Sequence, residues 1–318
     1  MIDFRYHVVS IVAVFLALTV GIVLGSSLFN EAAVRELHRQ ANQLRNDNAS
    51  LHLEKRDLQR DTQYRDEFVK QVAPTLVRGR LAGQPVVIVT LPGADSKVVD
   101  SLAKLLTEQS GARLTGQIAI KNEFTDEKQQ TTLNTLAEQL KPPALTLPDG
   151  TPQEAAAAEI AEAVVTSEPS GGGQDNVAGN TILAGFKEGG FVTVKGSPEQ
   201  RAALAVVVAS SGPAPSGEAA QRANQAYLAV LTALDRSGRG AVLAGPEQSA
   251  EDGGVIAALR NSGKAAKDVS SVDIADTEPG RVAVALALVA ETEGKSGHYG
   301  VHGRTDGPLP PILAQPAT

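Results

Sequence analysis

The sequence predicts an α/β protein in three parts: an N-terminal transmembrane helix, a coiled-coil stalk, and a doubly wound, mainly parallel α/β domain. An uncharged run at residues 8–29 predicts the membrane helix. A charged segment without Gly or Pro, residues 31–73, predicts the stalk. Beyond it, short β-branched runs alternate with helical patterns, which is typical of a parallel sheet covered by helices.

The composition narrows the classes of protein that the chain can belong to. Of its 318 residues 42% are hydrophobic but only 3% are aromatic, so aliphatic side chains must fill the core. A net charge of −7 gives nucleic-acid binding no electrostatic support. The chain has no cysteine, which excludes disulfides, thiolate catalysis and cysteine-based zinc sites, and removes the thiolate ligands that Cu(I) prefers.

The uncharged run is long enough to span a bilayer. As a helix, residues 8–29 would rise about 33 Å, close to the thickness of the hydrocarbon core. The apolar core of a cleaved signal peptide is shorter, about 7–15 residues, and follows a positively charged start. Here Arg5 is the only basic side chain before the run, and Asp3 offsets it. We therefore expect residues 1–30 to be an uncleaved signal anchor.

Small residues recur along one face of this span. Ala13, Ala17, Gly21 and Gly25 are spaced four apart, an arrangement that lets two membrane helices approach closely. The alternative is chance, because Gly and Ala are common in membrane helices. The spacing is consistent with a homodimer.

The segment 31–73 carries a heptad pattern. Its positions a and d are occupied by Val34, Leu37, Ala41, Leu44, Asn48, Leu51, Lys55, Leu58, Thr62, Arg65, Val69 and Val72. A single amide at an a position, Asn48, favours a parallel, in-register dimer. We therefore expect a dimeric coiled coil that breaks at Pro74. The alternative is a single amphipathic helix packed on its own domain.

The third part, residues 84–306, is predicted to be one α/β domain, followed by a Pro-rich tail at 307–318. The expected strands are Pro85–Thr90, Arg113–Ile120, Phe191–Val194, Leu204–Ala209, Ala241–Ala244 and Ser271–Ile274. The expected helices are Ser96–Gln109, Lys128–Leu140, Pro152–Thr166, Glu218–Arg236, Gly254–Asn261 and Arg281–Glu291.

The loops that follow the strands offer no catalytic motif. Thr90–Lys97 and Leu243–Ser249 lack the spacing of a P-loop or a dinucleotide fingerprint, and Asp95 and Ser96 are explained as helix caps. The chain has no Gly-x-Ser-x-Gly elbow. We therefore expect no enzyme activity and assign no catalytic or cofactor-binding residue.

Only one pair of histidines has a spacing suited to a metal. His298 and His302 are four apart, a spacing that suits a metal site on a helix, but Gly297, Gly300 and Gly303 disfavour a helix there. We expect a closing turn and assign no metal ligand.

The two ends of the chain resemble a known family. The opening, MIDFRYHVVSIVAVFLALTVGIVLG, closely resembles the N-terminus of the mycobacterial copper transport protein B (MctB) family, and the ending GHYGVHGRTDGPLPP looks like that family's close. The resemblance implies an actinobacterial cell-envelope protein in copper efflux or homeostasis, with its N-terminus cytoplasmic and its bulk outside. It identifies no copper ligand, and it leaves open which envelope membrane, including the outer one, holds the span.

Physical reasoning adds two further hypotheses. Ion paths through membranes are marked by ionisable residues, and the uncharged span has none, so we expect copper efflux to need partner proteins. The alternative is a non-enzymatic dimeric scaffold that recruits or regulates an envelope enzyme. Related proteins have been connected with cell separation, so the resemblance implies a cell-wall hydrolase of cell separation as that enzyme. A third hypothesis is a sensor that binds a small ligand at the carboxyl edge of the sheet, around Gly93–Ser96.

Overall fold

The computed structural model describes residues 4–168, 171–174, 176–213 and 216–311, and their side chains except those of residues 5 and 26–33. The chain divides into two compact units, Met1–Arg65 and Asp66–Thr318. Within the Pro-rich tail, residues 312–318 lie outside the described part.

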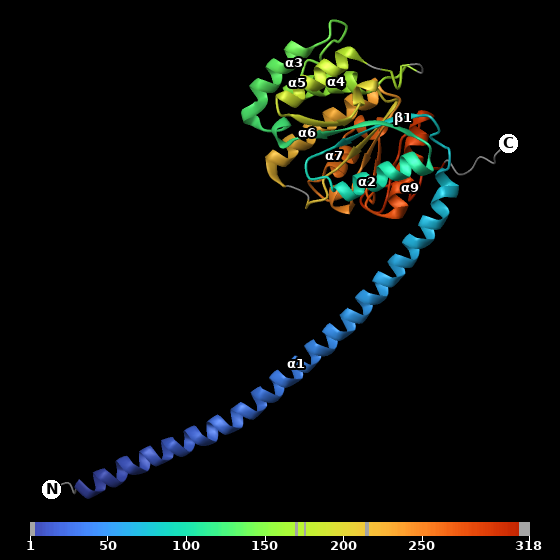
Figure 1. Ribbon diagram of the computed structural model, residues 1–318. Coiled ribbons are helices and arrows are strands. Elements are labelled where there is room, and N and C mark those ends of the chain that lie inside the picture. Colours follow the sequence, from blue (N-terminus) through green and yellow to red (C-terminus); the bar gives the residue numbers. More distant parts are fainter. Residues whose placement is uncertain (1–3, 169–170, 175, 214–215, 312–318) are drawn as a thin grey trace. The chain divides into compact units, whose positions relative to one another are not determined.

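The long helix α1, Phe4–Val77, makes up the described part of the first unit, and its last turns, from Asp66 on, belong to the second unit (Figure 1). Its stretch Tyr6–Gly25 has a mean hydropathy of 2.8 and is long and apolar enough to cross a membrane. The predicted N-terminal apolar helix is therefore confirmed. Whether it is retained as an anchor stays a prediction.

The helix ends later than the sequence predicts. It continues through Pro74 to Val77, although proline leaves one intrahelical hydrogen bond unmade. Ala73 and Val77 belong to the second unit and are buried in its core, and this packing stabilises the last turn beyond the proline. The predicted break at Pro74 is thus displaced by one turn.

The second unit is built around a seven-stranded sheet with the order β3-β2-β1-β4-β5-β6-β7. Its strands are β1 (Pro85–Thr90), β2 (Arg113–Ile120), β3 (Val192–Gly196), β4 (Leu204–Val208), β5 (Ala241–Ala244), β6 (Ser270–Val272) and β7 (His298–Tyr299). All neighbouring pairs are parallel except β2 and β3. The predicted mainly parallel sheet is confirmed.

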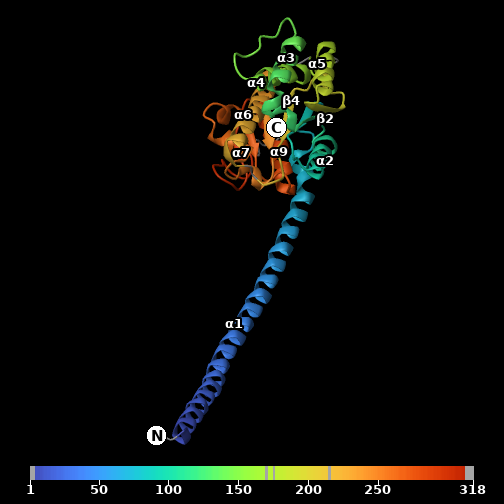
Figure 2. The ribbon, with the colours of Figure 1, turned by 90° about the vertical axis from the view of Figure 1, so that its left-hand side faces the viewer.

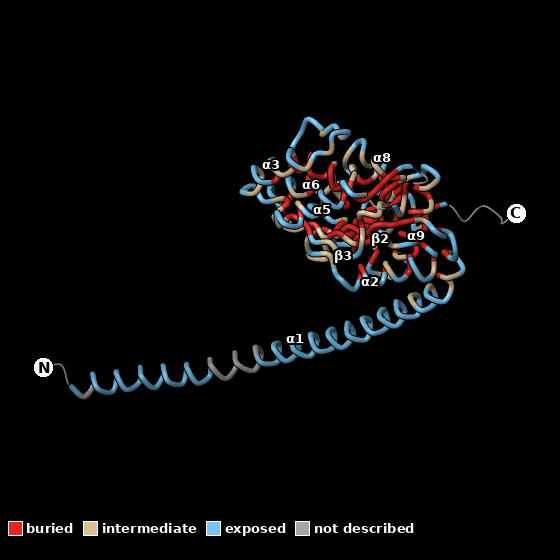
Figure 3. The backbone as a smooth tube through the Cα atoms, turned by 45° about the horizontal axis from the view of Figure 1, so that its top comes forward, coloured by how far each residue is buried: buried red, intermediate tan, exposed pale blue. Residues whose placement is uncertain are grey.

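Alternate residues of the central strands face two separate hydrophobic cores. In β1, Val87 and Val89 belong to one core, and Val86 and Ile88 belong to the other. All four side chains are fully buried, because helices cover both faces of the sheet. Figure 3 shows the buried chain concentrated in the sheet and the helices against it.

The helices fall into two groups on these faces. The described α-helices of the second unit after the end of α1 are α2 (Ser96–Lys104), α3 (Gln130–Leu140), α4 (Pro152–Val164), α5 (Val177–Glu188), α6 (Gly217–Ser237), α7 (Val255–Asn261), α8 (Ala265–Asp268) and α9 (Glu278–Thr292). Helices α2 and α9 pack on the core that contains Val86, and α3 to α7 on the core that contains Val87. Helices α3, α4 and α5 lie side by side (Figures 1 and 2).

Two predicted elements need correction. The strand predicted at Phe191–Val194 is β3, which begins one residue later and runs antiparallel at the edge of the sheet. The closing turn predicted at His298–His302 begins as β7, a short strand parallel to β6. Its pairing is long-range, so local glycine content could not reveal it.

Candidate functional site

The carboxyl ends of β2, β1, β4 and β5 meet at one edge of the sheet. Strand β1 lies between β2 and β4, so the strand order changes direction there. In open α/β sheets, ligands bind in the crevice at such a position. Two loops without a P-loop or dinucleotide motif, Thr90–Lys97 and Leu243–Ser249, both lie at this edge, after β1 and β5.

The loop after β1 caps helix α2, and its glycine allows close packing against the loop after β4. The Asp95 carboxylate accepts a hydrogen bond from the Lys97 amide at 2.8 Å, which confirms it as the cap of α2. Gly93 has φ +84°, and a Cβ on it would lie 2.5 Å from the Ser210 hydroxyl oxygen. Its carbonyl accepts from the Ser211 amide at 2.9 Å, so this glycine joins the loops after β1 and β4.

A cavity of about 400 Å³ opens at this edge. It is lined by Leu91, Pro92, Asn122, Thr125, Ser210, Gly212, Pro213, Ala219, Ala220, Ala223, Asn224, Tyr227, Gln248, Ser249, Gly254 and Val255. None of these described lining residues is charged. Burial raises the pKa of Tyr227, and a side-chain hydrogen bond with Thr125 partly offsets that rise. We name this space the switch-point cavity.

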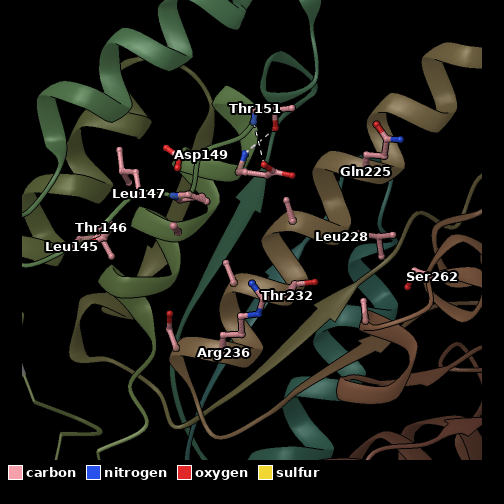
Figure 4. Close-up of a pocket in the computed structure, with 17 residues that line it drawn as sticks. Leu145, Thr146, Leu147, Asp149, Thr151, Gln225, Leu228, Thr232, Arg236 and Ser262 are labelled. Atoms are coloured by element: carbon pink, nitrogen blue, oxygen red, sulfur yellow. Dashed lines mark hydrogen bonds between the residues drawn. The ribbon is translucent and has the colours of Figure 1, made fainter.

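A broader groove of about 1060 Å³ lies between the segment 145–151 and one face of α6 (Figure 4). Its charged lining residues are Asp149, Glu154 and Arg236. Glu154 is engaged in a capping box, since it accepts from the Thr151 amide at 3.1 Å and its own amide donates to the Thr151 hydroxyl at 3.3 Å. This glutamate therefore serves the start of α4.

The two histidines with metal-like spacing bind different partners. His298 Nδ1 lies 3.0 Å from the Ser271 hydroxyl, and His302 Nε2 lies 3.1 Å from a carboxylate oxygen of Glu247. Burial and the nearby Arg260 guanidinium lower the pKa of His298. Within the described ranges, no three His, Cys, Asp or Glu residues form a group that could hold a metal ion.

The segment that follows β7 is held by a buried ion pair that the sequence did not predict. Arg260 Nη1 lies 2.8 Å from Asp273 Oδ2, and the two side chains are 4% and 0% exposed. Arg260 also donates to the Tyr299 and His302 carbonyls, while the amides of Val301 and His302 donate to Asp273. These bonds fasten the segment after β7 to the sheet.

The sequence contained only a weak indication that Arg260 and Asp273 would pair. Arg260 lies in the apolar helix α7, and Asp273 directly follows the buried strand β6. A charge in an otherwise apolar run is a candidate for pairing, but nothing local identifies its partner. The final segment that resembles a known family is, in this structure, the segment that Arg260 and Asp273 hold.

Two exposed stripes run along α1. Leu37, Leu44, Leu51 and Leu58 recur every seven residues, and each is 57–63% exposed. Asn48, between the middle two, donates to the Leu44 carbonyl at 3.0 Å.

The second stripe is the small-residue face of the apolar stretch. Ala13, Ala17, Gly21 and Gly25 lie in the helix as the sequence predicts. A Cβ placed on either glycine would have no atom within 4 Å, so both positions are open within this chain.

Comparison with known proteins assigns the chain a family. The family model described as "Copper transport outer membrane protein, MctB" matches residues 1–310. The copper transporter MctB of Mycobacterium tuberculosis H37Rv and that of Mycobacterium bovis are each 30% identical over 320 residues, covering 99% of this chain and all of the relative. The Mycobacterium leprae protein of the same name is 29% identical and covers 98% of this chain. The match includes both the apolar N-terminal helix and the end of the α/β unit, and the chain therefore belongs to the MctB family.

Proposed function

We propose that this protein is a membrane-anchored cell-envelope protein that supports copper efflux or homeostasis together with partner proteins. Family membership over residues 1–310 carries the copper-related part of the proposal, and the family description supports an envelope location. The apolar helix at Tyr6–Gly25 serves as the single span. Its N-terminus is cytoplasmic and the α/β unit lies outside.

Efflux through partners follows from the chemistry of the span. The stretch 8–29 has no charged side chain and no histidine. Ion paths through membranes are typically marked by ionisable residues that face a bundle interior or a water-filled cavity. Copper, as the substrate, would therefore cross through a second protein that this chain assembles or regulates.

The long helix is proposed to pair with a second copy. Leucines at every seventh position form a d-type seam, and Asn48 occupies the a position between Leu44 and Leu51. In a parallel dimer the Asn48 amide would pair with its counterpart and set the register. The small face with Gly21 and Gly25 would allow close approach of the two spans.

The exposed leucines also favour a second candidate function. A dimeric stalk that spaces an α/β unit from a membrane suits a non-enzymatic scaffold that recruits or regulates cell-separation hydrolases. In that case copper effects would be indirect.

Cell copper distinguishes the two candidates. In a strain that lacks this gene we expect total copper to rise under copper stress while septa stay normal, with rescue by the intact gene. The measurement is elemental analysis of washed cells, combined with imaging of the same cultures. Normal copper with chained, unseparated cells would contradict the copper proposal and support the scaffold.

The dimer seam can be tested on the full chain in detergent micelles. Replacing Leu51 by Glu places a charge in the seam, and we expect the dimer dissociation constant to rise by about a hundredfold or more. Leu53 is exposed to a similar extent, 56% against 62% for Leu51, but falls on the outward f position. Leu53→Glu is therefore the matched control and should leave sedimentation unchanged. Equal effects of the two variants, or a monomeric parent protein, would refute the seam.

A further inference from the structure

We infer that the switch-point cavity is a binding site for an uncharged, hydrogen-bonding heterocycle of about nucleoside size. The inference is independent of copper and of the membrane helix. It rests on the position of the cavity, its size, and the kinds of side chain that line it.

The cavity lies where the loops after four parallel strands meet. Lining residues come from the loops after four parallel strands: Asn122 after β2, Leu91 after β1, Ser210 after β4 and Gln248 after β5. Strand order changes direction at β1. This edge is where open α/β sheets bind ligands, because adjacent loops diverge there and leave a crevice.

The walls at this edge are held in place by backbone contacts. The Leu91 amide donates to the Val208 carbonyl at 2.9 Å, and the Ser211 amide donates to the Gly93 carbonyl at the same distance. On the far wall, the Asn224 side chain donates to the Gly253 carbonyl at 2.8 Å. These bonds link β1, β4, α6 and the start of α7, so the described walls are largely pre-formed, as in most small-molecule sites.

Size and charge narrow the ligand class. A volume of about 400 Å³ falls at the lower end of the range of small-molecule pockets. Because no described lining residue is charged, an ionised ligand would lose hydration without gaining an ion-pair partner. The loop after β1 also lacks the glycine spacing that cradles a diphosphate. A neutral, compact molecule fits these conditions.

The side chains that line the switch-point cavity favour a heterocyclic ligand. Asn122 and Gln248 supply amides, each of which offers a donor and an acceptor, as needed by the edge of a lactam or an amidine. The Tyr227 ring and the apolar side chains of Leu91 and Val255 supply surface for a flat body. Next to the lining residue Ser210, the Ser211 hydroxyl is buried without a hydrogen-bond partner, so this loop retains unused polar capacity.

The test uses the full chain in detergent micelles with defined probes. Adenosine, uridine and nicotinamide are titrated individually, and the 5′-monophosphates of the two nucleosides serve as charged comparators. Binding is followed by ligand-observed NMR and by the amide signals of Gly212 and Ala220. We expect saturable binding of at least one neutral probe, with shifts at both amides and weaker binding of its monophosphate.

Two substitutions on α6 make the site assignment specific. Ala223 lines the cavity, and Ala223→Leu should fill it and weaken binding about tenfold or more. Gln221 is exposed on the same helix and lines neither cavity described above, so Gln221→Leu is the matched control and should bind normally. The inference is overturned if no neutral probe binds, if the monophosphates bind more tightly, or if both variants bind as the parent does.

Discussion

Replacing Arg260 by Leu is expected to lower the free energy of unfolding of the α/β unit by about 3–5 kcal/mol. The substitution leaves the Asp273 carboxylate, which is fully buried, without its cation. It also removes the hydrogen bonds that Arg260 donates to the Tyr299 and His302 carbonyls. The measurement is a urea titration of the full chain in detergent micelles, read out by hydrogen exchange of the β4 amides.

An exposed pair provides the control for this prediction. Arg222 lies 2.7 Å from Glu127, but the two side chains are 48% and 64% exposed. Arg222→Leu should therefore cost no more than about 1 kcal/mol. Arg260→Lys keeps the charge without the planar fork and should fall between the two. If Arg260→Leu cost as little as Arg222→Leu, the buried pair would not hold the segment after β7.

The second large effect is a loss of stability as pH rises, caused by two buried glutamates. Burial raises the pKa of Glu159 to about 8, and the nearby Glu138 adds to the rise. Burial also raises the pKa of Glu291 to about 8, although a hydrogen bond from Ser270 opposes the shift. Neither carboxylate oxygen of Glu159 has a hydrogen-bond partner. Both groups are therefore protonated in the folded state at neutral pH.

The direction of the effect follows from proton linkage. The pKa of a glutamate is 4.5 in the unfolded chain and rises to about 8 for these two in the folded one, so the folded state binds more protons between these values. Stability is then highest below pH 4.5 for these groups, falls through this window, and levels off above pH 8. Between pH 6.5 and 8 we expect a loss of up to about 2 kcal/mol for each glutamate.

The chosen interval avoids two other titrations. Burial raises the pKa of Asp235 only to about 6, and the pKa of His298 is lowered from 6.5, so both groups change mainly below the interval. Glu159→Gln should remove about half of the pH dependence between pH 6.5 and 8, measured by urea titration at each pH. Glu188 is exposed on α5, and Glu188→Gln is the control. Identical pH profiles for the parent and Glu159→Gln would contradict the prediction.

Local patterns in the sequence determine much of the α/β unit. The bounds predicted for β1, β2 and β5 match the structure residue for residue. Strands β1 and β5 are short apolar or β-branched runs between turn residues, and β2 ends in the apolar run Ile118–Ile120. The predicted helix Ser96–Gln109 is also present, with its last turn widened to a π-helix. A strand that is apolar on both faces must be buried on both faces, and such strands are typical of a mainly parallel sheet covered by helices. The apolar N-terminal helix was equally evident from length and hydropathy.

Long-range packing decided the remaining features. Helix α5 was not predicted because its two glycines lower helix propensity, yet a Cβ on Gly179 would lie 2.7 Å from the Ala163 carbonyl, and one on Gly185 would meet Leu140. The glycines are what allow α5 to pack closely on its neighbours. The antiparallel direction of β3 likewise depends on which strand it meets at the sheet edge.

The candidate sites divide in the same way. The sequence alone identified the loops at the carboxyl edge, the Asp95 cap, the heptad leucines and the family to which the two ends point. Only the tertiary structure joined the loops after four strands into one cavity, gave His298 and His302 separate partners, and paired Arg260 with Asp273 across 13 residues. Residue type and spacing report the local backbone, whereas cavities and buried ion pairs depend on contacts between segments that the chain brings together only on folding.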